Sequence, residues 1–124
     1  MTESILAVVK DLFFVAKIRE TARLTGTAVE FCRSPDDLKG RLESGKVPDL
    51  VIVDLTTPGW DYESLFALLE AQSPRPPTVA FTTHALARTT QRWHGRCDRV
   101  LTKEAFTQEL PELLLHGAGA RQGR

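Results

Sequence analysis

The amino-acid sequence predicts a single α/β domain built on a doubly wound, five-stranded parallel sheet. Short runs of apolar and often β-branched residues alternate with longer segments whose apolar residues recur at helical spacing, and this β-α pattern occurs five times. The first run, residues 5–9, is apolar without interruption, which is typical of a strand that helices cover on both faces. With 124 residues, 42% of them hydrophobic, the chain is long enough to bury one core.

Local signals place each element in turn. Gly26 is expected to end the first helix, while Ser34 and Pro35 form a typical helix start, with a capping hydroxyl followed by proline. The usual order in a five-stranded sheet of this class is 2-1-3-4-5. The domain is expected to span residues 1–116, with a disordered Gly- and Arg-rich tail over 117–124. The predicted strands are 5–9, 28–32, 49–55, 78–81 and 99–101, and the predicted helices are 12–24, 35–45, 61–72, 85–94 and 103–115.

Charge and hydropathy exclude several classes of protein. Lys+Arg and Asp+Glu both number 16, so the chain lacks the basic excess that nonspecific nucleic-acid binding requires. No apolar run approaches the roughly 18 residues of a membrane helix, and the N-terminal residues lack the basic region of a signal peptide. We therefore expect a cytoplasmic protein that contacts neither a membrane nor nucleic acid directly.

The two cysteines, Cys32 and Cys97, are expected to be free thiols. They form no CxxC motif and have no histidine at zinc-ligand spacing. In the predicted strand order they lie at opposite edges of the sheet, about four strand spacings of ~4.8 Å apart, which is too far for a disulfide.

Polar side chains follow the predicted strands at the edge of the sheet where ligands bind in folds of this class. Lys10 and Asp11 follow the first strand, and Asp54 ends the third. Thr82 and Thr83 follow the fourth strand, and Thr102 and Lys103 follow the fifth. A carboxylate, a hydroxyl and an ammonium group that converge can handle a phosphoryl group: the acid attacks phosphorus while the other two bind its oxygens. The sequence therefore allows a phosphoryl-binding site at this edge of the sheet, although a carboxylate beside an ammonium group is a simple ion pair in most proteins.

Three segments carry a resemblance to a known family. Residues 49–61, with Asp54 at the end of an apolar strand and a Pro-Gly turn after it, resemble the central motif of the CheY-like receiver domains of response regulators. Residues 81–84 resemble the Thr/Ser-Ala-His segment of the family's fourth strand, and residues 101–103 resemble its strand-five lysine. The resemblance implies a flavodoxin-like receiver fold in which Asp54 accepts phosphate, Thr82 is the hydroxyl partner and Lys103 is the ammonium. It implies no enzyme activity beyond self-phosphorylation and dephosphorylation of Asp54.

The sequence departs from the family pattern at three places. Receivers usually end their first strand with two adjacent acids that hold Mg²⁺, but the matching positions are expected to be Val9 and Lys10, with Asp11 as the nearest acid. Val100 replaces the aromatic residue of strand five, and Glu104 replaces the proline that follows the lysine. Because Mg²⁺ prefers octahedral oxygen ligands, we expect Asp11 and Asp54 to form a weak Mg²⁺ site or none.

Two signalling roles remain open at this point. In the first, the chain is a stand-alone pseudo-receiver of a two-component system or phosphorelay, which docks to a signalling protein such as a histidine kinase or a downstream effector. Its site is then inert, either because Lys10 or Lys103 pairs permanently with Asp54 or because Asp54, Thr82 and Lys103 satisfy one another's hydrogen bonds. In the second, the chain is a working response regulator phosphorylated on Asp54, with Mg²⁺ held by Asp11 and Asp54.

A flavodoxin-like domain that binds a small ligand is a lesser alternative. Flavin binding needs a hydroxyl-rich loop after the first strand, and residues 10–13, Lys-Asp-Leu-Phe, do not provide one. The GxGxxG motif of dinucleotide binding is also absent.

A cluster of arginines around the predicted fourth helix is a candidate partner surface. In receivers the fourth helix, fifth strand and fifth helix form the usual output face, which would also suit a homodimer. A solvated helix face is the alternative interpretation. An exposed Trp93 would indicate an interface anchor and a buried one a core residue. The candidate surface comprises Arg88, Arg92, Trp93, Arg96 and Arg99.

Overall fold

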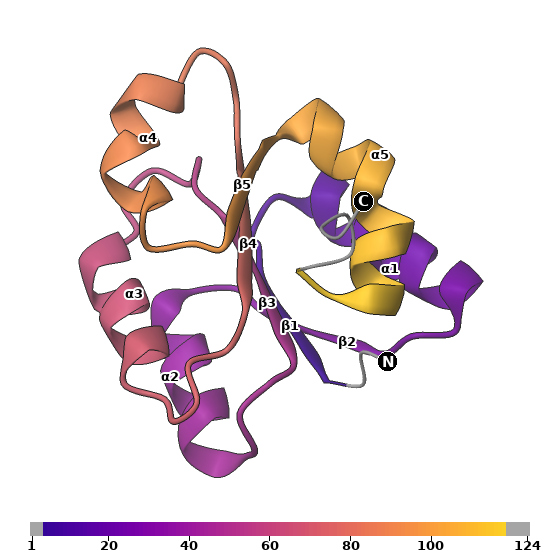
Figure 1. Ribbon diagram of the computed structural model, residues 1–124, viewed down its shortest axis with the longest axis horizontal. Coiled ribbons are helices and arrows are strands. Elements are labelled where there is room, and N and C mark those ends of the chain that lie inside the picture. The colour runs from indigo at the N-terminus through magenta and orange to yellow at the C-terminus, as the bar shows by residue number, and fades with distance from the viewer. Residues whose placement is uncertain (1–3, 119–124) are drawn as a thin grey trace.

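The five predicted strands form one parallel sheet in the order β2-β1-β3-β4-β5, as expected (Figure 1). The computed structural model describes residues 4–118. The strands are β1 (Ile5–Val8), β2 (Val29–Cys32), β3 (Leu50–Asp54), β4 (Thr78–Thr82) and β5 (Arg99–Thr102). The helices are α1 (Leu12–Thr25), α2 (Pro35–Ser44), α3 (Tyr62–Glu70), α4 (Ala87–His94) and α5 (Lys103–His116).

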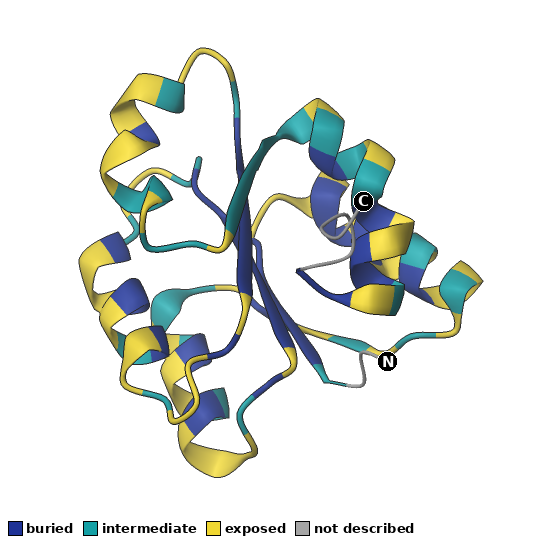
Figure 2. Ribbon diagram, in the orientation of Figure 1, coloured by how far each residue is buried: buried dark blue, intermediate teal, exposed yellow. Residues whose placement is uncertain are grey.

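Helices cover both faces of the sheet. Figure 1 shows α1 and α5 on one side and α2, α3 and α4 on the other. Side chains alternate between the two faces along each strand, so Ile5 and Ala7 join the core under α1 and α5, whereas Leu6 and Val8 join the core under α2 and α3. This double covering explains why β1, β3 and β4 are buried along their whole length, whereas the edge strands β2 and β5 are only partly buried (Figure 2).

The helix ends follow the capping signals of the sequence. The Ser34 side chain accepts a hydrogen bond from the Asp37 N–H at the start of α2, and the Thr102 side chain accepts one from Ala105 at the start of α5. Gly26 ends α1 with a φ of 71°, a left-handed conformation that glycine adopts without steric cost. These ends fix where each strand begins and therefore which residues reach the carboxyl edge of the sheet.

The predicted boundary of the C-terminal tail is corrected by two residues. Gly117 and Ala118 are buried, and Ala118 packs into the core under α1 and α5. The rest of the predicted tail, residues 119–124, lies outside the described residues. Within residues 4–118, no helix is both long enough and apolar enough to cross a membrane.

Candidate functional site

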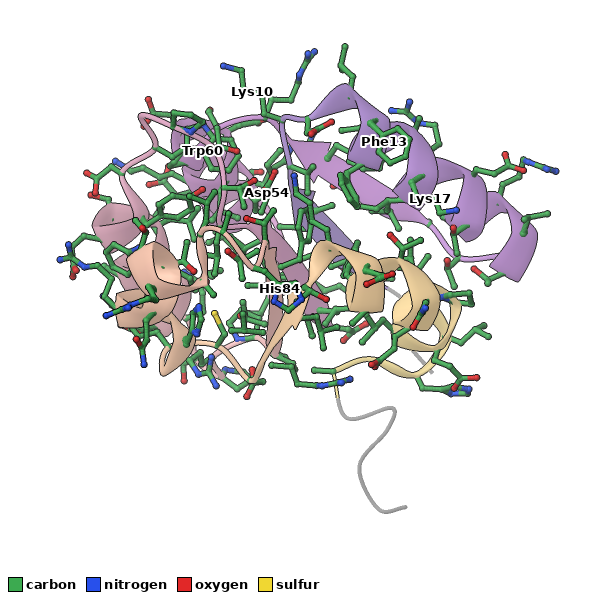
Figure 3. All side chains as sticks on the ribbon, turned by 90° about the horizontal axis from the view of Figure 1, so that it is seen from above. Lys10, Phe13, Lys17, Asp54, Trp60 and His84 are labelled. Atoms are coloured by element: carbon green, nitrogen blue, oxygen red, sulfur yellow. The ribbon has the colours of Figure 1, made fainter. Side chains whose placement is uncertain are left out.

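A cleft of about 430 Å³ opens at the carboxyl ends of β1 and β3, where the sequence places the phosphoryl site. Figure 3 looks onto this side of the molecule, with Lys10 at the outer edge and Asp54 further in. The cleft combines two carboxylates, an ammonium group and two hydroxyls on a short loop. Its lining residues are Lys10, Asp11, Asp54, Thr56, Thr57 and Pro58.

Asp54 is the most buried acid of the cleft, with 1% of its surface exposed. Its Oδ1 accepts hydrogen bonds from the Thr56 backbone N–H at 2.8 Å and from the Thr56 hydroxyl at 2.5 Å. These two hydrogen bonds from one residue fix the orientation of the carboxyl group. Thr56 was not among the residues predicted for the site, although an aspartate whose side chain accepts from the backbone N–H two residues later is a common turn feature.

Tyr62, at the start of α3, forms hydrogen bonds that hold the loop after β3 in place. Its hydroxyl donates to the Asp54 carbonyl oxygen at 2.6 Å and accepts from the Thr57 N–H at 3.1 Å. Burial raises the pKa of the phenol from its ordinary value of 10.0 to about 12, and the nearby Asp54 charge adds to this rise. No sequence signal pointed to Tyr62, because its role depends on the path of the loop.

Replacing Tyr62 by phenylalanine is expected to lower the free energy of unfolding by about 1–2 kcal/mol at pH 7, because a buried carbonyl loses its donor. The raised pKa means that the neutral phenol stabilises the folded state fully below pH 10, and that this contribution disappears as pH rises through about 12. Urea unfolding of both proteins should therefore show a stability difference that shrinks over this window. A difference that stays constant up to pH 12 would contradict this assignment.

The structure corrects the assignment of the residues after β1. From the sequence we expected Val9 and Lys10 at the two acid positions, but Val9 is fully buried in the core under α1 and α5. Lys10 and Asp11 line the cleft instead. The reason is the alternation of β1, which turns Val9 to the same face as Ile5 and Ala7. One of the two positions that reach the cleft is therefore an acid, and the other is a lysine.

The donor set of the cleft fits Mg²⁺ poorly. Asp11 caps α1, and its Oδ1 accepts from the Phe13 N–H at 2.8 Å. The Asp54 Oδ1 is engaged by Thr56, so each carboxylate keeps one oxygen without a hydrogen bond within residues 4–118. Lys10 adds a positive charge at the same cleft. Over the described residues, no three His, Cys, Asp or Glu side chains group as a metal site.

Thr82 does not line the cleft, because its hydroxyl is turned toward α4. Thr82 Oγ1 lies 3.2 Å from Thr90 Oγ1, which in turn lies 2.9 Å from His94 Nε2. Alternation along β4 explains this orientation: Phe81, which pairs with Asp54 in the sheet, faces α1 and α5, so Thr82 faces the opposite side. Thr90 is 5% exposed and connects Thr82 to His94 through these contacts. Nothing in the sequence predicted this role for Thr90.

Lys103 also lies outside the lining of the cleft. Its Nζ sits 5.1 Å from the ring centre of Phe14, a cation–π contact with α1. Within the described part of the chain, neither Lys103 nor Lys10 forms an ion pair with Asp54, so the expected permanent pair is wrong. The expected hydrogen bonding among Asp54, Thr82 and Lys103 is wrong too, since each has other partners.

The predicted arginine surface divides into two groups. Arg88 and Arg92 are exposed on α4. Arg96 instead binds both carboxylate oxygens of Glu70, at 2.8 and 2.9 Å, and hydrogen bonds to Glu70 hold its pKa above the ordinary range. Arg99 lies 2.9 Å from Glu109 of α5. These last two arginines link secondary-structure elements within the chain.

Trp93 is half-buried and packs against the core under α3. Its ring stacks on Phe66 with 5.7 Å between centres and an angle of 20° between planes. The Arg92 guanidinium covers the ring at 4.7 Å. From the sequence, a buried Trp93 would indicate a core residue and an exposed one an interface anchor. Trp93 is partly buried against the core, which is closer to the first case.

Both cysteines are free thiols, as predicted. Burial raises the pKa of Cys32 to about 11 and that of Cys97 to about 12. The thiols therefore stay protonated at neutral pH, which makes them poor nucleophiles.

Comparison with solved structures finds proteins whose fold matches this one over most of both chains. The chemotaxis response regulator CheY4 of Vibrio cholerae is similar with a TM-score of 0.76 and 18% identity, over 94% of this chain and 99% of that one. A receiver domain of a sensor histidine kinase from Pseudomonas aeruginosa, with a magnesium ion in its active-site cleft, has a TM-score of 0.75 and 24% identity over 96% and 99%. An adenylate cyclase structure from Rhodopirellula baltica has a TM-score of 0.70 and 18% identity over 90% and 88%.

No family model matches the sequence, and no curated protein matches it. The sheet order agrees with these structural neighbours, and most of the neighbours are response regulators or receiver domains by name. The chain therefore has the flavodoxin-like fold of response-regulator receiver domains.

Proposed function

We propose that this chain is a receiver-like signalling module of a two-component system or phosphorelay, and that it acts through protein–protein contacts with little or no Mg²⁺-dependent phosphorylation. The observation that carries this proposal is the make-up of the cleft around Asp54. Two carboxylates reach it, and Lys10 stands where a further acid would be needed. Without a bound cation, the charge that develops on a transferring phosphoryl group lacks its main compensation.

The position of Thr82 and Lys103 supports the same proposal. A phosphoryl group on Asp54 would need a hydroxyl and an ammonium group that are free to turn toward it. Thr82 is engaged with Thr90, and Lys103 lies over Phe14. Recruiting either one would break a contact that the folded protein already makes, which weakens the case for an efficient phosphoacceptor.

A working response regulator is the second candidate function. Asp11 and Asp54 line one cleft, and this shared position favours a site in which both hold Mg²⁺ while Asp54 accepts phosphate. A flavodoxin-like domain for a small ligand remains a lesser candidate, with no observation of its own in its favour.

The proposed partner is a cytoplasmic signalling protein such as a histidine kinase or a downstream effector. Arg88 and Arg92 are the exposed members of the candidate surface, so we assign the contact on α4 to them and expect an acidic partner there. Arg96, Arg99 and Trp93 would shape that face through their contacts within the chain. A homodimer through α4, β5 and α5 is the alternative use of the same face.

Titration with beryllofluoride and Mg²⁺ tests the proposal. Trp60, at the rim of the loop after β3, is the fluorescent reporter, and a Trp93→Phe background removes the other tryptophan. We expect no saturable change in Trp60 fluorescence at millimolar Mg²⁺, and no added mass after incubation with acetyl phosphate. A saturable change or a phosphoryl adduct that disappears in Asp54→Asn would favour the working response regulator instead.

A further inference from the structure

We propose that a pocket between the loop after β3 and the start of α4 binds a small, uncharged aromatic compound. The pocket has a volume of about 310 Å³, which lies within the range of small-molecule sites. Figure 3 shows Trp60, which lines the pocket, on the same side of the molecule as Asp54. A flavodoxin-like ligand domain would use the loop after β1 instead, so this site is an addition to the signalling module. It is called the aromatic pocket below, and its lining includes Trp60, Tyr62, Trp93, Leu86, Thr57 and Thr89.

Three aromatic rings adjoin one another in the lining of the aromatic pocket. The ring centres of Trp60 and Tyr62 are 6.0 Å apart, and those of Tyr62 and Trp93 are 5.9 Å apart. Separations of this size are typical of attractive aromatic pairs, and a further ring gains from the same offset or edge-on contacts. The row of rings therefore favours a planar aromatic ligand over an aliphatic one of similar size.

Two of these rings are held in place by contacts within the chain. The Tyr62 hydroxyl donates to the Asp54 carbonyl oxygen at 2.6 Å, which fixes the phenol. The Trp93 ring is stacked on Phe66, and the Arg92 guanidinium lies over it. Because these contacts order the rings already, a ligand loses less free energy in ordering the site when it binds.

The polar groups of the aromatic pocket are uncharged. Among the described residues that line it, none has a charged side chain. The hydroxyls of Thr57 and Thr89 form no hydrogen bond within residues 4–118, so both are available to a ligand. Arg92 and Arg96 lie 4.7 and 5.9 Å from the centre of the Trp93 ring and disfavour a cation beside it. The aromatic pocket therefore suits a neutral ring that carries a hydroxyl or an N–H group.

Other occupants fit the aromatic pocket less well. A charged ligand would lose hydration without meeting an opposite charge in the lining. An aromatic side chain of a partner protein would need further apolar surface around the pocket to form a stable interface. Of the large apolar side chains that are exposed over residues 4–118, Leu86 is the one that borders the pocket. The same shortage of apolar surface argues against a second copy of this chain.

A titration with indole tests the inference, because indole is planar, uncharged and carries one N–H group. The chain has two tryptophans, so a ¹⁵N-labelled sample gives two indole N–H resonances, which W60F and W93F assign. The buffer contains EDTA and no phosphate donor, so the result is independent of any chemistry at Asp54. We expect the Trp60 resonance to shift and to saturate by about 5 mM indole, and cyclohexanol to cause no saturable shift. Indole-3-acetate and tryptamine, which are charged, should bind at least about fivefold more weakly than indole.

Two variants change the lining of the aromatic pocket. Trp60→Leu stays apolar but loses a ring, and should weaken indole binding at least about fivefold, whereas Trp60→Phe should stay within about threefold. The Trp93 resonance is the reporter in both. Leu86→Asp puts a carboxylate at the pocket and should weaken binding at least about tenfold. Leu86 is the N-cap residue of α4 and makes no capping hydrogen bond with its side chain, so aspartate at this position should not weaken the helix.

Leu12→Asp is the matched control for Leu86→Asp. Leu12 is 69% exposed in the first turn of α1 and lies outside the aromatic pocket, so indole affinity should not change. Urea unfolding of each variant checks that the protein is folded before titration. The inference is overturned by the absence of a saturable shift, by equal binding of cyclohexanol or of either charged analogue, or by an L12D effect as large as that of L86D.

Two further outcomes would assign the aromatic pocket to a protein. A blocked Gly-Trp-Gly peptide that binds at least about tenfold more tightly than indole would indicate a partner's side chain. Concentration-dependent dimerisation that W60L abolishes would indicate a second copy of this chain. Either result would overturn the small-molecule assignment.

These outcomes are distinguishable from failure of the proposed function. The beryllofluoride titration depends on Asp54 and Mg²⁺, whereas the indole titration is performed without either metal or phosphate donor. A protein that forms the beryllofluoride adduct and also binds indole would contradict only the weak-Mg²⁺ proposal. A protein that does neither would contradict only the aromatic pocket.

Discussion

Replacing Lys10 by aspartate is expected to raise the affinity of the cleft for Mg²⁺ by at least about tenfold. The change removes an ammonium group and adds a carboxylate beside Asp11 and Asp54, so the charge of the cleft falls by two units. A third carboxylate brings the donor set closer to what a hard divalent cation prefers. If the missing acid is the main defect of the site, the variant should also form a beryllofluoride adduct that the original protein does not form.

The measurement is a Mg²⁺ titration followed by Trp60 fluorescence in the Trp93→Phe background, with and without beryllofluoride. Lys46→Asp is the matched control, because Lys46 is exposed near the opposite end of the sheet and the net charge changes equally. A tenfold gain in K10D and little change in K46D would assign the effect to the cleft. Equal gains in both variants would mean that net charge, and not the missing ligand, controls the affinity.

Replacing Phe81 by alanine is expected to lower the free energy of unfolding by about 3–5 kcal/mol. Phe81 is fully buried in β4, with ring centres 4.9 Å from Phe14 and 4.6 Å from Phe106. Its removal leaves a cavity where β4, α1 and α5 meet, and the two remaining rings cannot both move to fill it. The loss is a large part of the ~5–15 kcal/mol by which a domain is usually stable.

Urea unfolding followed by circular dichroism measures this loss. Phe31→Ala is the control, because Phe31 lies on the edge strand β2, is only partly buried, and is covered by Arg19 at 5.0 Å. We expect the Phe31 variant to lose about 1–2 kcal/mol, clearly less than the Phe81 variant. Similar losses at the two positions would show that the packing around Phe81 relaxes far more than its central place suggests.

The order of elements and the position of Asp54 were predictable because they depend on local patterns. Short apolar runs mark the strands, the Ser-Pro pair marks the start of α2, and Gly26 marks the end of α1. Parallel strands joined by helices bring their carboxyl ends to one edge, so Asp54 and Asp11 reach the same cleft. The cysteines were predictable for the same reason, since strand order alone keeps Cys32 and Cys97 apart.

The contacts of the site depend on which face each residue takes and on what lies across from it. A shift of one residue decides that Val9 enters the core while Lys10 reaches the cleft, and alternation along β4 turns Thr82 toward Thr90. Tyr62 and Arg96 bind groups that the fold brings to them from other segments of the chain.

The sequence by itself determined the sheet, its strand order and an aspartate at the end of the central strand. The strands and helices follow from the spacing of apolar residues, which is a local property of the sequence. The strand order follows from the few topologies that short, right-handed connections allow. Only the tertiary structure decided that Thr82 and Lys103 lie away from the lining of the cleft and that Leu12 and Phe13 are left uncovered. Side-chain partners depend on distances across elements, and residue type alone does not specify those distances.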